Sequence, residues 1–282
     1  GPFDSTAASY LGTFLLASQA LTDTRRVTSN GKAQQHGKPS ARLSCLTPDL
    51  QRTKGLLKDN VILPKPFVNV GLPKSGSSSL AKFFRCSGFV SSHHRNRWRE
   101  AIGECMYRAV EQGLPPFASC DAWKTNRTMA TNYSDPKDTA TIGWMQVDAI
   151  VKDQCFFPQI SLLEELHQEQ PQATFILNLR PLEDWYRSVR KWHSMQERLT
   201  NCELPGLPKG KGATMQEMEQ FVCRHVNRVR SFVKSHPSHK LVELDLYDSE
   251  TNAVVLSQLF GGKQECWRHE NRNRSKKGVK TM

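Results

Sequence analysis

Long apolar runs, paired metal-binding cysteines and acidic side chains are all scarce in this sequence. No stretch approaches the ~18 apolar residues that a membrane-spanning helix needs, and the best candidate, residues 10–17, is too short. Eight cysteines include no C-x-x-C pair, so we expect no bound metal. Acidic residues number 27 against 39 basic ones, a net charge of +12. That excess predicts attraction to anions such as nucleotides or anionic glycans.

The cysteines and three glycosylation sequons indicate an oxidising compartment. The cysteine count is even, as is common where disulfides form. N-x-[ST] sequons begin at Asn126, Asn132 and Asn273. The chain opens with Gly1-Pro2 and no initiator Met, the pattern of a protease-cleavage scar, which allows for an upstream signal or membrane anchor that has been removed. We therefore expect a glycoprotein of the secretory pathway or Golgi lumen, attached to a membrane only through such an anchor, although the sequence leaves a cytoplasmic location open.

Composition divides the chain near residue 60. Residues 1–60 are rich in Ser, Thr, Gln, Gly and Lys with little periodicity, and we interpret them as an N-terminal extension or stem. Residues 61–282 alternate strand-like and helix-like segments, of which 173–179 is the clearest buried strand. This alternation predicts one α/β domain of three layers, with a mostly parallel central sheet, helices on both faces and ligands at the carboxyl ends of the strands.

The first strand-to-helix junction, at residues 68–80, is a Gly/Ser loop suited to an anion. Gly71 and Gly76 frame four residues, as in the G-x-x-x-x-G-K-[ST] phosphate loop. Where that motif has its lysine this chain has Ser77, and a lysine stands inside the loop instead, as Lys74. Glycine lets the backbone approach closely, and N–H groups at a helix start point at bound oxygens. We expect a phosphate loop without the lysine that reaches the β and γ phosphates of a nucleoside triphosphate.

The second junction directly follows the buried strand. Arg180 stands at the strand end and Ser188 lies eight residues later in a predicted helix. Because the long Arg180 side chain can turn back, both residues are able to meet one anion. Trp185 and Trp192 lie on the apolar stripe of the same helix, and we expect both in the core.

Both junctions resemble motifs of sulfotransferases that use 3'-phosphoadenosine 5'-phosphosulfate (PAPS). Residues 72–80, Leu-Pro-Lys-Ser-Gly-Ser-Ser-Ser-Leu, are similar to the P-K-S-G-T-T-x-L loop of that family. Residues 180–188 are similar to its R-x-P-x-D-x-x-x-S segment, with the same offset from Arg to Ser but a one-residue shift of the Pro. The resemblance implies in-line transfer of a sulfuryl group from PAPS to a hydroxyl of a glycan or small-molecule acceptor, an anionic one included. It implies no nucleic-acid partner.

The resemblance also implies a role for each matched residue. The implied cofactor-binding residues are Pro73, Lys74, Ser75, Gly76, Ser77, Ser78 and Ser79 for the 5'-phosphosulfate, Arg180 and Ser188 for the 3'-phosphate, and Lys276, Lys277 and Gly278 in a basic C-terminal loop. A plain basic tail is the alternative for that last segment. Lys74 is also the implied catalytic cation beside the leaving phosphate oxygen, because in-line transfer needs positive charge where negative charge develops.

Transfer to a hydroxyl further requires a base, which in the resembling family is a His or Glu beyond the first helix. His93 and His94 follow the expected second strand, at a strand end that faces the ligand, and His is the usual proton acceptor near neutral pH. Glu100, Glu104 and Asp148 are the alternatives. We place the histidines first.

Two other functions fit parts of the sequence. A P-loop kinase would use ATP and Mg²⁺, but its lysine after the second loop glycine is missing. A non-catalytic anion-binding module would need only the basic surface, and Arg180 and Ser188 would then matter no more than other surface residues. The pairing of the two junctions favours the sulfotransferase.

Overall fold

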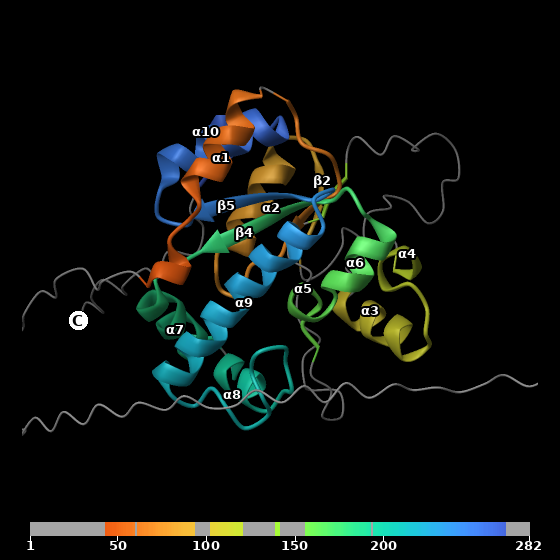
Figure 1. The fold of residues 1–282 in the computed structure, drawn as a ribbon, viewed down its shortest axis with the longest axis vertical. Coiled ribbons are helices and arrows are strands. Elements are labelled where there is room, and N and C mark those ends of the chain that lie inside the picture. The colour runs from red at the N-terminus through yellow and green to blue at the C-terminus, as the bar shows by residue number, and fades with distance from the viewer. Residues whose placement is uncertain are drawn as a thin grey trace, which may run out of the picture. The chain divides into compact units, whose positions relative to one another are not determined.

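The computed structural model of the protein describes residues 43–59, 61–93, 102–120, 139–141, 156–192 and 194–268 (Figure 1). Its centre is a five-stranded sheet in the order β2-β3-β1-β4-β5, and every neighbouring pair is parallel. The strands are β1 (Phe67–Asn69), β2 (Val90–Ser92), β3 (Thr139–Thr141), β4 (Thr174–Leu179) and β5 (Lys240–Asp245). The predicted α/β class with a parallel sheet is confirmed.

One face of the sheet carries an aromatic-rich cluster. The elements that pack there are α1 (Leu50–Lys58), α2 (Ser77–Cys86), α10 (Ser249–Phe260) and the 3-10 turn η3 (Gln264–Cys266). Phe260 of α10 meets two rings edge-on, Phe67 of β1 at 4.7 Å and Phe84 of α2 at 5.7 Å between ring centres. Edge-to-face packing of large rings is favourable beyond the area it buries, so this cluster fixes α2, and the loop before it, against the sheet.

The other face is covered by a longer series of helices. These are α3 (Ile102–Glu111), α4 (Pro116–Ser119), α5 (Pro158–Ser161), α6 (Leu163–Glu169), α7 (Leu182–Lys191), α8 (Met195–Thr200) and α9 (Met215–Ser235), with the 3-10 turn η1 (Ser44–Leu46) beside α9. Helix α9 begins with a capping box, in which Thr214 accepts from the Glu217 N–H and the Glu217 carboxylate accepts from the Thr214 N–H.

Strand β4 explains why the sequence reads as an uninterrupted apolar run. Phe175, Leu177 and Leu179 point into the cluster formed with α7 and α9, whereas Ile176 points into the cluster formed with α2 and α10. A strand buried on both faces has no position left for polar alternation. Helices therefore lie on both sides of the sheet, with α1 and α10 on one side and α7 and α9 on the other in Figure 1.

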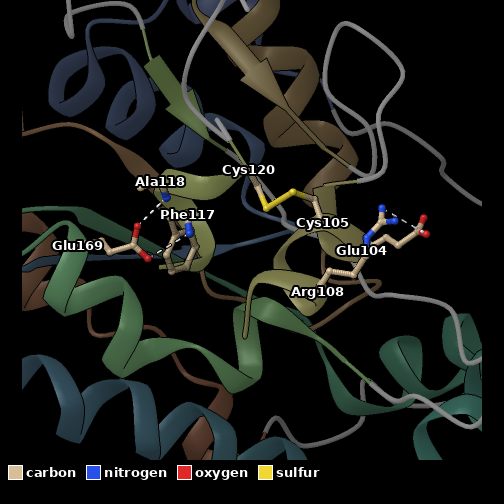
Figure 2. The surroundings of a disulfide bond; sticks show 7 residues. All are labelled: Glu104, Cys105, Arg108, Phe117, Ala118, Cys120 and Glu169. Carbon is tan, nitrogen blue, oxygen red and sulfur yellow. Dashed lines mark hydrogen bonds and ion pairs between the residues drawn. A yellow bond between two sulfur atoms is a disulfide. The ribbon is translucent and has the colours of Figure 1, made fainter. Parts of the chain in front are cut away.

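Three disulfides hold distant parts of the described chain together. Cys45–Cys223 and Cys86–Cys266 join residues 178 and 180 positions apart, and Cys105–Cys120 joins α3 to the end of α4. Cys202 is disulfide-bonded as well, so the described residues contain no free thiol. Figure 2 shows how α4 is held from its other end, where Glu169 of α6 accepts from the Phe117 and Ala118 N–H groups. Such cross-linking is typical of an oxidising, secretory-type compartment.

Several expectations fall outside the described residues, namely all three sequons, residues 1–42 and the basic segment with Lys276, Lys277 and Gly278. The predicted division at residues 60 and 61 remains a prediction, while η1 and α1 before it pack on α9, α10 and β5. Within the described ranges no helix is both long and apolar enough to cross a membrane.

Candidate active site

The Gly/Ser loop lies between β1 and α2 and is pressed against the carboxyl ends of the neighbouring strands. A Cβ on Gly71 would come within 3.0 Å of the Asn69 Oδ1 and 3.1 Å of the Asn178 backbone nitrogen. Gly76 has a φ of +100°, and a Cβ there would come within 2.4 Å of Leu246 Cδ1. Gly76 is therefore favoured by both its left-handed conformation and its tight surroundings, and Gly71 allows the close approach of the neighbouring backbone. The loop occupies the sheet edge at which parallel α/β folds bind ligands.

Three contacts from the second junction brace this loop. The Trp185 Nε1–H donates to the Pro73 carbonyl at 2.8 Å, and the Arg180 Nη1–H donates to the Lys74 carbonyl at 3.0 Å. The Lys74 Nζ lies 3.6 Å from the centre of the Trp192 ring. The structure thus brings together two motifs that are more than 100 residues apart in the chain.

Lys74 is placed by an unusual backbone conformation. Its φ of +69° is left-handed, which is uncommon for a residue other than glycine and typical of functional loops. Burial, and secondly the charge of Arg180, lower the pKa of the Lys74 ammonium to about 8. At pH 7 that pKa leaves roughly ten protonated molecules for each neutral one. Lys74 is therefore still a cation at neutral pH, held at some electrostatic cost next to a second cation.

Neither cation is neutralised within the described part of the chain. Lys74 and Arg180 form no salt bridge there, and the Arg180 Nε is buried without a hydrogen-bond partner. The Arg180 guanidinium carbon lies 5.9 Å from the centre of the Tyr247 ring, and the Tyr247 hydroxyl donates to Asp184 at 3.1 Å. Two adjacent cations that lack a carboxylate partner are suited to a ligand with more than one negative charge.

Ser188 is buried in α7, as the predicted helix requires. No hydrogen bond joins it to Arg180, so their shared anion stays a prediction. Helix α2 begins at Ser77 with Gly76 as its N-cap, which offers no capping side chain. The positive end of the helix dipole at Ser77, Ser78 and Ser79 therefore faces the loop without a side-chain acceptor from the N-cap.

Of the two candidate bases that the structure describes, His93 lies at the loop. It follows β2 directly, and its Nε2 lies 3.0 Å from the Ser77 Oγ at the first turn of α2. Glu104 lies instead in α3, where it pairs with Arg108 at 3.5 Å beside the Cys105–Cys120 disulfide (Figure 2). His94, Glu100 and Asp148 lie outside the described residues.

The prediction that both tryptophans pack in the core holds for Trp185 and is wrong for Trp192. Trp185 is 2% exposed, but its N–H reaches the loop carbonyl as well. Trp192 is 43% exposed, because it lies one residue beyond α7, where the backbone is already extended and the helical stripe no longer applies. The prediction that Trp192 packs in the core is thus corrected to a rim position beside Lys74.

A buried histidine that sequence reasoning did not single out forms a hydrogen bond to the backbone just before the loop. His225 of α9 is 1% exposed, and its Nε2–H donates to the Val70 carbonyl at 2.7 Å. Burial above all lowers its pKa to about 4, which keeps the imidazole neutral. Its Nδ1 is buried without a hydrogen-bond partner, and His225 lines a small pocket together with Ser75, Asn178 and Arg180. The signal that could have found it, a His on the apolar face of α9, is weak because such residues are usually structural.

The fold and the site together define a parallel α/β protein whose Gly/Ser loop lies at the carboxyl ends of the strands. A family model described as a sulfotransferase domain matches residues 67–228, which is more than half of the chain and runs from β1 into α9. The chain belongs to this sulfotransferase family. Comparison with curated proteins and with solved structures gave no match.

Proposed function

We propose that this sulfotransferase uses PAPS as its sulfuryl donor and a hydroxyl of a glycan or small molecule as its acceptor. The observation that carries the proposal is the meeting of the two junctions, in which Arg180 donates to the Lys74 carbonyl while neither cation has an acidic partner among the described residues. PAPS has negative charge at two separate positions, the 5'-phosphosulfate and the 3'-phosphate. A site with one cation on each junction matches that arrangement.

The loop also fits the 5' end of such a donor. Gly71 and Gly76 let the backbone come close, and the uncapped start of α2 directs N–H groups toward bound oxygens. Pro73, Ser75, Ser77, Ser78 and Ser79 complete the proposed cradle for the phosphosulfate. Arg180 with Ser188 would hold the 3'-phosphate, and Lys276, Lys277 and Gly278 would close over the nucleotide.

The donor supplies the sulfuryl group and a phosphate leaving group. Lys74 stabilises the negative charge that develops on the phosphate oxygen as the bond from sulfur to that oxygen breaks. His93 accepts the proton that the acceptor hydroxyl loses when its oxygen bonds to sulfur. Ser77 orients the imidazole through the 3.0 Å hydrogen bond. The products are a sulfate ester and 3'-phosphoadenosine 5'-phosphate (PAP), with the displaced proton on His93.

The disulfides support a lumenal setting for this reaction. Cross-links between residues 178 and 180 positions apart persist in oxidising compartments. We therefore place the protein in the secretory pathway, with the Golgi lumen as the proposed location and the sequons as proposed glycosylation sites. Glycan hydroxyls are abundant acceptors there, and we propose no nucleic-acid partner.

Calorimetric titration with PAP, and separately with ATP and Mg²⁺, tests the donor class. We expect PAP to bind more tightly than ATP with Mg²⁺, because the loop lacks the lysine of nucleoside triphosphate sites. Lys74→Ala and Arg180→Ala should each weaken PAP binding, whereas Arg190→Ala, at an exposed position of α7, should not. Binding of ATP with Mg²⁺ in preference to PAP would support the kinase instead.

A further inference from the structure

The contact between Lys74 and Trp192 is the closest of the described pairs in which a cation lies over an aromatic ring. The ammonium nitrogen lies 3.6 Å from the ring centre, against 5.8 Å for Arg190 over Tyr186 on the same helix. The face of an indole ring attracts a cation more strongly than that of any other aromatic side chain. The pair is also built from both junctions, because Lys74 belongs to the loop and Trp192 follows α7.

Trp192 contributes little to the hydrophobic core. The side chain is 43% exposed, so its removal leaves little cavity in the core, in contrast to the fully enclosed Trp185. The backbone is extended at Trp192, and its ring lies against Lys74 of the loop. The lysine side chain has a flexible four-carbon stem and loses much conformational entropy when it is held in one rotamer. Contact with the Trp192 ring therefore restricts the position of the Lys74 ammonium before a ligand binds.

We propose that Trp192 is a positioning residue that holds the Lys74 ammonium at the mouth of the loop, ready for the anionic donor. The inference rests on the proposed function for the identity of that donor. Trp192 touches neither the transferred group nor the acceptor in this account, and acts through Lys74. The ring also stabilises the charged form of a lysine that is otherwise disfavoured by burial and by the neighbouring Arg180.

A series of replacements at position 192 separates this role from simple filling of space. We expect kcat/KM for PAPS to decrease in the order Trp, Tyr, Phe, Leu, since the attraction of the ring face for a cation weakens in that order. Trp192→Leu should lose about 5- to 30-fold. The same replacement in a Lys74→Met background should change kcat/KM for PAPS less than about 2-fold, because the partner is gone. Equal losses in both backgrounds would overturn the proposal.

Lysine labelling tests the pair without reference to the donor. The reagent is an amine-reactive ester at pH 7, and the modification of Lys74 is measured by mass spectrometry relative to Lys54 of α1. Trp192→Leu should raise the Lys74 rate several-fold, since the ring covers the amine and favours its unreactive charged form, and Trp192→Phe should give an intermediate rate. Tyr186→Leu, which removes the looser pair on the same helix, is the matched control and should leave the rate unchanged.

The two tests fail in different ways. If the wild-type protein does not bind PAP while labelling depends on residue 192, the donor assignment is wrong and the Lys74–Trp192 pair stands. If PAP binds and labelling is the same in all position-192 variants, the donor assignment stands and the positioning role is wrong. Melting temperatures within about 2 °C of wild type confirm folded variants, as expected for an exposed side chain.

Discussion

Two groups of charged residues in this protein differ in whether their charges are paired. Around Glu243 of β5, which is 2% exposed, Arg230 makes two hydrogen bonds of 2.9 and 2.6 Å to the carboxylate, the Asp49 N–H donates to it at 3.0 Å, and Arg52 lies 3.7 Å away. We call these four residues the Glu243 cluster. Lys74 and Arg180, in contrast, lie side by side, and the described residues place no carboxylate in a salt bridge with either.

The difference distinguishes charges that support the fold from charges that await a ligand. Arg230 also donates to the Cys45 and Thr47 carbonyls, so the Glu243 cluster fastens the segment before α1 to the sheet. Every buried charge in it has a partner, as stability requires. Lys74 bears an electrostatic penalty instead, seen in its lowered pKa. Perturbed, unpaired groups of this kind mark functional sites.

The largest expected effects come from substitutions in the Lys74–Arg180 pair and in the Glu243 cluster. Lys74→Ala should reduce sulfuryl transfer by about 1,000-fold, because a preorganised donor to the developing charge is lost. Its free energy of unfolding should stay within about 1 kcal/mol of wild type, since no buried partner is left unpaired. Turnover and urea unfolding of the same samples check both values, with Lys54→Ala as the control. A large loss of stability with intact turnover would reverse the assigned roles.

Breaking the Glu243 cluster should do the opposite. Arg230→Met leaves the Glu243 carboxylate buried with less compensation, and we expect a loss of about 3–5 kcal/mol in the free energy of unfolding. The double variant Arg230→Met with Glu243→Gln should recover part of that loss, because the buried charge is removed as well. Turnover per folded molecule should remain near wild type. Urea unfolding at neutral pH measures the losses, and an unchanged stability would show that the cluster is not structural.

A variant at His93 distinguishes the acceptor reaction from donor binding within the site. His93→Asn keeps a polar side chain but removes the proton acceptor, and we expect kcat to fall about 100-fold. PAP affinity should change little, because the proposed role of His93 concerns the acceptor. Glu104→Gln, at the ion pair with Arg108, is the control and should leave kcat unchanged. Weakened PAP binding with unchanged kcat in His93→Asn would assign this residue to the donor site instead.

The smallest effect is a pH dependence. The Lys74 pKa is lowered from 10.5 to about 8, so the ammonium loses its proton as the pH rises through that value. We expect kcat/KM for PAPS to fall by up to about tenfold per pH unit above pH 8, since this ratio reports the free enzyme. Lys74→Arg, whose guanidinium stays charged, should abolish the decline even if its overall rate is lower. A decline that persists in Lys74→Arg would belong to another group.

The sequence predicted the parts of this site that local pattern determines. Gly71, Lys74 and Gly76 stand out because a strand precedes them and a helix follows, and Arg180 stands out because it ends a continuous apolar strand. Such junctions repeat the order of strand, loop and helix that parallel sheets impose. Helix and strand periodicity was therefore enough to predict that both motifs lie at the carboxyl ends of the strands.

What could not be predicted depends on contacts between distant residues. The Trp185 N–H meets Pro73, and His225 meets the Val70 carbonyl 155 residues away, through tertiary packing that no local pattern encodes. Trp192 followed the helical stripe in sequence, but α7 ends one residue earlier. The disulfide partners were open in the same way, because eight cysteines allow about 105 pairings.

Discrimination between PAP and 5'-AMP tests the central claim most directly, because these nucleotides differ only in the 3'-phosphate. If the two junctions form one donor site, calorimetry should show PAP binding at least about 100-fold more tightly than AMP, as expected when a charged hydrogen-bonding group loses its partner. Arg180→Ala should remove most of that preference by weakening PAP alone. Equal affinities in the wild type, or a preference that survives in Arg180→Ala, would contradict the account.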